Sequence, residues 1–152
     1  MSKRIINFYR ERDLYGEFSN FYPATIEIKN LIWPTTEHYF QAMKFIDHPM
    51  IVEEIRLLNT PGESAKRGRS RSLPLRKDWE DVKEDVMREA LFAKFTQHKR
   101  LRELLRSTGD AFLVEHTRND SYWGDGGDGS GKNRLGFLLM ELRQEFDKKN
   151  LE

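Results

Sequence analysis

The chain has 152 residues, of which 26 are basic and 25 are acidic, so its net charge is +1. Hydrophobic residues make up 38% and aromatic residues 12%, which is enough for one hydrophobic core and argues against intrinsic disorder. The balanced charge predicts no general affinity for polyanions. The absence of cysteine excludes disulfides, thiolate catalysis, cysteine-ligated zinc and iron–sulfur clusters.

The length fits one domain, which we expect to span residues 1–152. The first ten residues are charged and lack the apolar region of a signal peptide. No apolar run approaches the roughly 18 residues that a membrane-spanning helix needs. We therefore expect a cytoplasmic protein without a membrane association or an obligate protein partner.

The first third of the chain predicts short strands followed by a helix. Residues 5–9 are an apolar run typical of a strand, and residues 24–32 alternate around Asn30 like a hairpin. An aromatic-rich loop, residues 17–23, lies between them. Pro34 then precedes a helical pattern, for which Thr35 or Thr36 is the expected N-cap.

The rest of the chain is mainly helical in pattern. Helices are expected at residues 51–58, 79–96 (the longest) and 133–146. Residues 63–71 suit one short helix that leads into a loop, and residues 101–106 a further turn or helix. Gly109 is a candidate C-cap, and residues 112–114 read as a strand before a loop at residues 117–132. The sequence therefore predicts an α+β fold, dominated by helices and with a few short strands.

The most informative segment is the glycine-rich loop, which holds five of the ten glycines between Gly124 and Gly131. Such a loop brings backbone N–H groups close to a ligand, and it leads into a helix N-terminus that favours anions. Residues 126–133 nearly match a phosphate-binding loop, but Asn133 stands where Ser or Thr should hold magnesium. We exclude an ATPase or GTPase and expect ligand binding, with a flexible connection as the alternative.

A polar stripe on the helix that follows Pro34 is the second candidate. Glu37, Gln41 and Lys44 stand at i, i+4 and i+7, so they fall on one helix face. A charged stripe of this kind is often only a solvated surface. Aromatic residues on both sides place the helix close to the core, however, and favour a catalytic acid or base at Glu37.

Two weaker signals complete the inventory. The basic run at residues 66–71 suits a phosphate or a nucleic acid, although a solvated turn is the simpler interpretation. The four histidines lack metal-ligand spacing, so no metal site is expected. His116 follows Glu115 and is either an acid/base residue or a structural histidine.

Taken together, these motifs resemble the NADAR, or YbiA-like, superfamily. The matching segments occur in the family's order and span nearly the whole chain: GEFSNF at 16–21, WPTTEHYFQA at 33–42 with Lys44 and Phe45, AKRGR at 65–69, and YWGDGG at 122–127 with GKNRLG at 131–136. The resemblance implies an α+β fold and an N-glycosidase that needs no cofactor. The implied substrates are ribosylamino-pyrimidine phosphates, early intermediates of riboflavin biosynthesis, which would be cleaved to ribose 5-phosphate and a pyrimidine.

Two alternatives stay open at this point. The same bond type occurs in ADP-ribosylated guanine in DNA, which relatives hydrolyse, so that such DNA is the alternative partner. A non-catalytic module that binds ADP-ribose or a nucleotide is the second alternative.

Cleavage of a ribose–base bond needs a carboxylate and a proton donor. We expect Glu37 and Asp125 to act as the catalytic carboxylates, with Trp123 stacking on the base and Asn20 hydrogen-bonded to ribose or base. Phosphate is expected on the backbone of residues 126–131, with nearby cations adding charge and Lys44 either holding phosphate or tuning Glu37. The full set of expected substrate-binding residues is Asn20, Trp33, Lys44, Arg67, Arg69, Trp123, Gly124, Gly126, Gly131, Lys132 and Asn133.

Overall fold

A computed structural model describes residues 3–149, and these residues form two compact units. The central unit consists of residues 20–97. The terminal unit joins residues 3–19 to residues 98–149. Each unit is described by itself, and the single domain expected over residues 1–152 stays a prediction.

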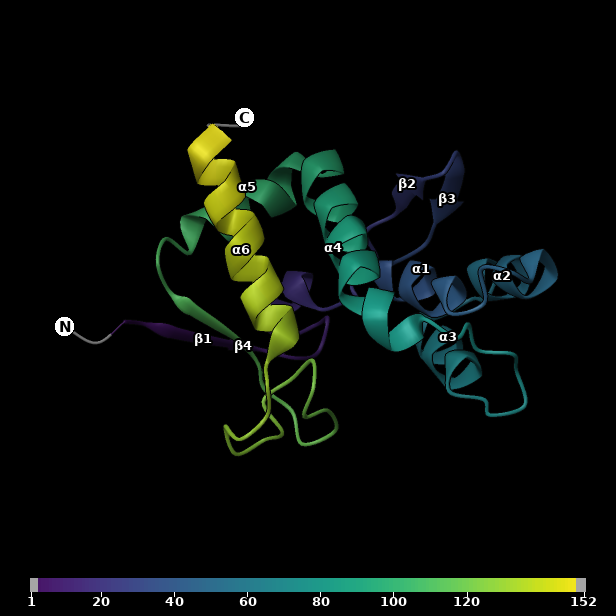
Figure 1. Ribbon diagram of the computed structural model, residues 1–152. Coiled ribbons are helices and arrows are strands. Elements are labelled where there is room, and N and C mark those ends of the chain that lie inside the picture. The colour runs from purple at the N-terminus through teal and green to yellow at the C-terminus, as the bar shows by residue number, and fades with distance from the viewer. Residues whose placement is uncertain (1–2, 150–152) are drawn as a thin grey trace. The chain divides into compact units, whose positions relative to one another are not determined.

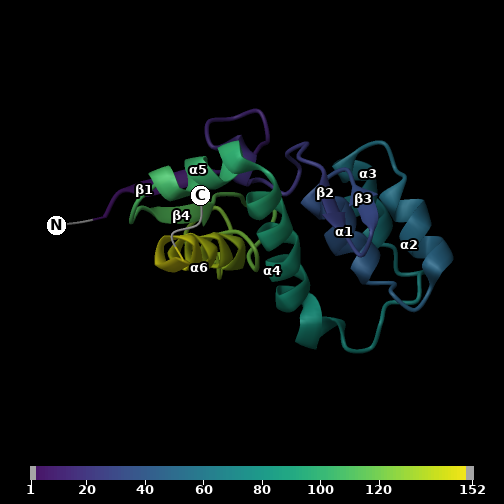
Figure 2. The ribbon, with the colours of Figure 1, turned by 90° about the horizontal axis from the view of Figure 1, so that it is seen from above.

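The terminal unit is built around a pair of parallel strands. Strand β1 (Ile5–Phe8) pairs with β4 (Phe112–Glu115), with Ile5 opposite Phe112 and Phe8 opposite Glu115. Helices α5 (Lys99–Ser107) and α6 (Arg134–Lys149) flank this strand pair in Figure 2, and a short 3-10 helix, Gly16–Phe18, follows β1. The buried faces of α6 and β4 meet in the core of this unit.

The packing of α6 against β4 depends on Gly136. A Cβ atom at this position would lie 2.1 Å from the Leu113 carbonyl oxygen, which is backbone and cannot rotate away. We expect Gly136→Ala to lower the free energy of unfolding by about 1–3 kcal/mol, because overpacking forces a backbone shift. Thermal unfolding measures the effect. Gly62→Ala is the matched control, since its Cβ would meet only the Thr60 hydroxyl at 3.9 Å; equal melting temperatures would contradict the prediction.

The central unit surrounds one buried helix. A hairpin of β2 (Ile26–Ile28) and β3 (Leu31–Trp33) precedes α1 (Thr36–Met43), and α2 (Pro49–Arg56), α3 (Pro61–Gly68) and α4 (Trp79–Gln97) follow it. Helix α1 contacts each of the three later helices, as the right half of Figure 1 shows. All eight residues of α1 are buried.

The elements expected from the sequence are present, and the α+β class is confirmed. The hairpin turns at Lys29 and Asn30, whose φ angles of 57° and 65° suit a two-residue turn. Helix α4 is the longest of the described helices, with 19 residues. Helix α2 begins at Pro49, two residues before the expected start, because proline is favoured in the first turn of a helix. Within residues 3–149, no helix is long and apolar enough to cross a membrane.

Candidate active site

The first turn of α1 is fixed by side chains from both sides. Thr35 is the N-cap and its hydroxyl accepts a hydrogen bond from the backbone N–H of His38. The Thr36 hydroxyl donates to the Asn20 side-chain oxygen at 2.8 Å, and the backbone N–H of Glu37 donates to the Asn20 carbonyl at 3.2 Å. Asn20 therefore holds the start of the helix that carries Glu37.

Glu37 is a buried carboxylate. It is 9% exposed, and its Oε2 accepts a hydrogen bond of 2.6 Å from Nε2 of Gln41, one turn further along α1. The expected contact across one helical turn is therefore present, but the stripe is not a solvated surface. Helix α3 packs against α1, and Gln41 is only 6% exposed.

Lys44 adds a positive charge to this cluster. Its Nζ donates to the Gly68 carbonyl at 3.3 Å and lies 5.9 Å from the ring centres of both Phe40 and Trp79. Burial lowers the pKa of the Lys44 ammonium group, and the nearby Glu37 carboxylate opposes this shift. A cation that lies beside two adjacent aromatic rings and near a buried carboxylate can stabilise an anionic substrate group.

Three other predicted residues of the central unit differ in their surroundings. Arg69 caps the C-terminal end of α3, is exposed, and acts electrostatically on Lys44. The Arg67 guanidinium instead forms an ion pair with Glu54, with Nε 2.6 Å from a carboxylate oxygen. Trp33 is fully buried and its indole N–H donates to the Ile28 carbonyl, so it faces the core of the unit in this structure.

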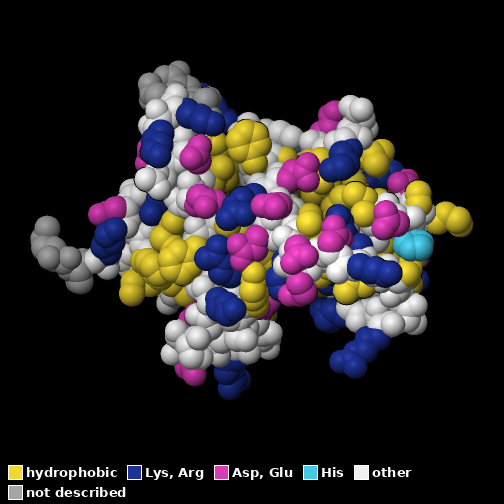
Figure 3. All heavy atoms as spheres, in the orientation of Figure 1, with side chains coloured by type: hydrophobic (Ala, Val, Ile, Leu, Met, Phe, Trp, Pro, Cys, Tyr) yellow, Lys and Arg dark blue, Asp and Glu magenta, His cyan; other side chains and the backbone are white. Residues whose placement is uncertain are grey.

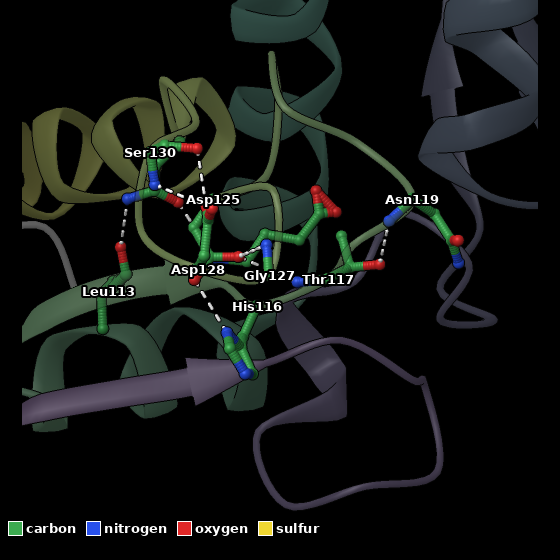
Figure 4. A network of polar contacts seen from close by, with 10 residues as sticks. Leu113, His116, Thr117, Asn119, Asp125, Gly127, Asp128 and Ser130 are labelled. Carbon is green, nitrogen blue, oxygen red and sulfur yellow. Dashed lines mark hydrogen bonds and ion pairs between the residues drawn. The ribbon is translucent and has the colours of Figure 1, made fainter.

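The glycine-rich loop of the terminal unit is organised by Asp125. Its Oδ2 lies 2.7 Å from Nδ1 of His116, and its Oδ1 accepts from the backbone N–H groups of Thr117 at 3.0 Å and Gly127 at 2.8 Å. Figure 4 shows these groups converging on the carboxylate. Burial works to raise the pKa of Asp125, but the hydrogen bonds from His116, Gly127 and Thr117 outweigh it and hold the pKa below its ordinary value.

Hydrogen bonds within the loop disfavour the expected binding of phosphate to its backbone. Most of its N–H groups already donate within the loop: Gly126 to the Asp120 carbonyl, Gly127 to the Asp125 side chain, Ser130 to the Asp128 side chain, and Gly131 to the Asp125 carbonyl. The first N–H groups of α6 are also paired, because Arg134 and Leu135 donate to the carbonyls of Tyr122 and Trp123. Four of the six backbone N–H groups at residues 126–131 are therefore already paired, and phosphate binding by this backbone stays a prediction that the loop geometry disfavours.

The remaining predicted residues of this unit are partly structural. Asn133, whose φ is 51°, accepts from the Glu115 N–H and donates to the Leu113 carbonyl, so its side chain ties the loop to β4. Gly124 accepts from the backbone N–H of Asn133. Trp123 is half-buried beside Tyr122, and Lys132 is exposed with its Nζ 5.5 Å from the Tyr122 ring centre. Trp123 and Lys132 can therefore reach a ligand.

The structure adds two residues that were not among the expected site residues. Gly68 lies against Gln41 and accepts from Lys44; in the sequence it stood only within the basic AKRGR motif. His116 is oriented by Asp125, which the sequence separates from it by nine positions. Among residues 3–149, no three acidic or histidine side chains are grouped to hold a metal ion.

The comparisons agree with this architecture. The model of the NADAR domain matches residues 7–147. The chain is 60% identical to the N-glycosidase YbiA of Escherichia coli (strain K12), over 96% of this chain and 91% of that protein. It is also 44% identical to the riboflavin biosynthesis protein PYRR, chloroplastic, of Zea mays, over 93% of this chain and 25% of that protein. The NMR structure of Escherichia coli YbiA matches with a TM-score of 0.90 at 58% identity, covering 100% of this chain and 90% of that one.

The structure therefore has the helix-dominated α+β fold that the sequence predicts. The chain belongs to the NADAR family, and the resemblance inferred from its motifs is confirmed.

Proposed function

We propose that this chain is an N-glycosidase that hydrolyses the ribose–base bond of ribosylamino-pyrimidine phosphates and releases ribose 5-phosphate. The enzyme class agrees with the prediction and is confirmed by the relatives, which include a named N-glycosidase and a riboflavin biosynthesis protein. The particular substrate is our proposal. It combines that relationship with the charges of the central unit.

The observation that carries the proposal is the buried pair of Glu37 and Gln41 beside Lys44. Glu37 is held at one oxygen by Gln41, and the Lys44 ammonium group interacts with it electrostatically. A carboxylate in this setting can stabilise the cationic sugar that develops as the bond to the base breaks, or it can activate water. Among the two predicted carboxylates, Glu37 is the one we assign to the chemical step.

The reaction balances without a further reactant. The bond between ribose C1′ and the base nitrogen breaks, and its electron pair stays with the nitrogen. The oxygen of water forms the new bond to C1′. One proton of that water stays on the new hydroxyl group and the other is delivered to the departing base.

Most backbone N–H groups of the glycine-rich loop are already paired, so other groups are needed to bind the phosphate. We assign the phosphate to Lys44 and the exposed Arg69, whose charges lie close enough to influence each other. Trp123 and Lys132 stay predicted substrate contacts within the terminal unit. Asp125 becomes a positioning residue, because both of its oxygens accept hydrogen bonds from the protein.

The test is release of ribose 5-phosphate from 5-amino-6-ribosylamino-uracil phosphate, followed in a discontinuous assay. We expect multiple turnovers with this small phosphate. ADP-ribosylated guanine DNA runs in parallel, because Arg69 and Arg71 are both exposed and suit a nucleic-acid backbone. On the face drawn in Figure 3, however, acidic and basic side chains are interspersed rather than gathered into one basic field.

Each result has a distinct meaning. Release from the DNA alone would replace our substrate by ADP-ribosylated guanine, and neutralising Arg69 and Arg71 should then reduce that activity. Stable binding without release of base from either substrate would make the chain a binding module and overturn the proposal.

A further inference from the structure

The contact between α1 and α3 is unusually close at one point. A Cβ atom on Gly68 would lie 1.9 Å from Oε1 and 2.7 Å from Cδ of Gln41. The space that any other residue would fill with its Cβ is therefore taken by the Gln41 amide. Glycine at position 68 is what allows this amide to lie between the two helices.

The amide also has a defined orientation. Its nitrogen donates to Glu37, whereas its Oε1 has no hydrogen-bond partner among residues 3–149 although the side chain is buried. A buried amide oxygen without a donor is unfavourable. The reverse orientation is worse, because it would set the amide oxygen against the carboxylate. The interaction with Glu37 therefore decides how Gln41 lies.

Gly68 contacts the cluster a second time. Its carbonyl accepts a hydrogen bond from Lys44 Nζ at 3.3 Å, so the same residue that admits the Gln41 amide also fixes the ammonium group near Glu37. The last turn of α3 thus touches both partners of the carboxylate.

We propose that Gln41 and Gly68 are positioning residues for the reaction: Gln41 holds Glu37 in its ionised form and in one orientation, and Gly68 provides the space that this arrangement needs. The inference rests on the proposed catalytic role of Glu37. A hydrogen bond donated to a carboxylate favours its charged form. The arrangement therefore keeps Glu37 ready to stabilise the sugar cation or activate water.

Substitution of Gln41 leaves the charged groups around the cluster in place. Besides Glu37 and Lys44, these groups are Arg69 at the end of α3 and Glu80 and Lys83 on α4, each of which acts electrostatically on Lys44. The comparison of wild type with a Gln41 variant therefore changes the hydrogen bond to Glu37 but none of these charges.

The first experiment replaces Gln41 by methionine, which has a similar length but no donor. We expect kcat to fall by about 10- to 100-fold with KM within about threefold of wild type. The acidic limb of the kcat profile should move to higher pH by about one unit, the shift that corresponds to losing a hydrogen bond to a charged group. Ser64→Ala is the matched control, because Ser64 is a fully buried residue of α3 whose hydroxyl also has no partner within residues 3–149. It should keep both the rate and the profile.

The second experiment tests Gly68 through a double-mutant cycle. Gly68→Ala alone should reduce both kcat and the melting temperature, whereas Gly62→Ala, on the same helix, should not. In the Gln41→Ala background the contacts at 1.9 and 2.7 Å are removed and only a Cβ–Cβ contact of 3.1 Å remains, so Gly68→Ala should have a clearly smaller effect on stability and rate than it has in the wild-type chain. The stability cycle can be read even if a variant is too slow to assay.

Two outcomes would overturn the inference: an acidic limb of Gln41→Met at the wild-type pH, or additive effects of Gly68→Ala and Gln41→Ala. If Glu37→Gln is inactive and either outcome is found, only the positioning role fails. If Glu37→Gln is fully active, the assignment of Glu37 in the proposed function fails first.

Discussion

Replacing Glu37 by glutamine is expected to reduce kcat by on the order of 10²- to 10⁴-fold, the contribution of a positioned acid or base. Glutamine has nearly the same shape and its amide oxygen can still accept from Gln41, so the side chain should keep its place in the buried pair. What it loses is the negative charge beside the developing sugar cation and the ability to take a proton. The measurement is kcat for ribose 5-phosphate release, together with the melting temperature.

Glu89→Gln is the control for this variant. Glu89 is also a carboxylate of the central unit that accepts from a buried side chain, the Tyr39 hydroxyl, but it is 45% exposed and pairs with Lys29. An exposed pair of this kind contributes at most about 1 kcal/mol, so the rate should stay close to that of wild type. A folded Glu37→Gln variant with a kcat within threefold of wild type would remove Glu37 from the chemical step.

Helical spacing predicted which residues of α1 are neighbours but not that they are buried. The contact of Glu37 with Gln41 follows directly from the i, i+4 relation. Their burial depends on α3, and in particular on Gly68, which stands 27 positions after Gln41. The flanking aromatic residues indicated that the helix lies near the core, but not that α3 packs against it, because α3 is itself polar and basic.

In the terminal unit, too, the local sequence predicted the elements but not the contacts between distant segments. The strands at its centre were expected from short apolar runs, but their parallel pairing joins Ile5 to Phe112 across most of the chain. In the loop, composition predicted close approaches of the backbone, and the loop does make many backbone contacts. Composition could not predict that these contacts occupy N–H groups that we expected to bind phosphate, because the pairing depends on the orientation of the Asp125 side chain.

Asp125→Asn is expected to loosen the glycine-rich loop. An amide cannot accept from His116, Thr117 and Gly127 at once in the way that a carboxylate does, because one of its two atoms is a donor. Losing one hydrogen bond to a charged group costs about 2 kcal/mol, which lowers the melting temperature of a chain of this size by roughly 4–8 °C. Because this loop carries Trp123, which we propose as a contact of the base, kcat/KM should fall by about 10- to 100-fold, mainly through KM.

The exposed carboxylate of the same loop provides the comparison. The Asp128 carboxylate is exposed and accepts from the backbone and hydroxyl groups of the neighbouring Ser130, so Asp128→Asn should change neither KM nor the melting temperature appreciably. The pH dependence gives a further check on Asp125. Because folding lowers its pKa, the carboxylate stabilises the folded chain above the ordinary value of 3.8 and loses this effect as the pH falls below it. The stability difference between wild type and Asp125→Asn should therefore be largest near neutral pH and shrink below about pH 4. A difference that is unchanged down to pH 3, or a KM equal to that of Asp128→Asn, would show that the ionised carboxylate does not organise the loop for binding.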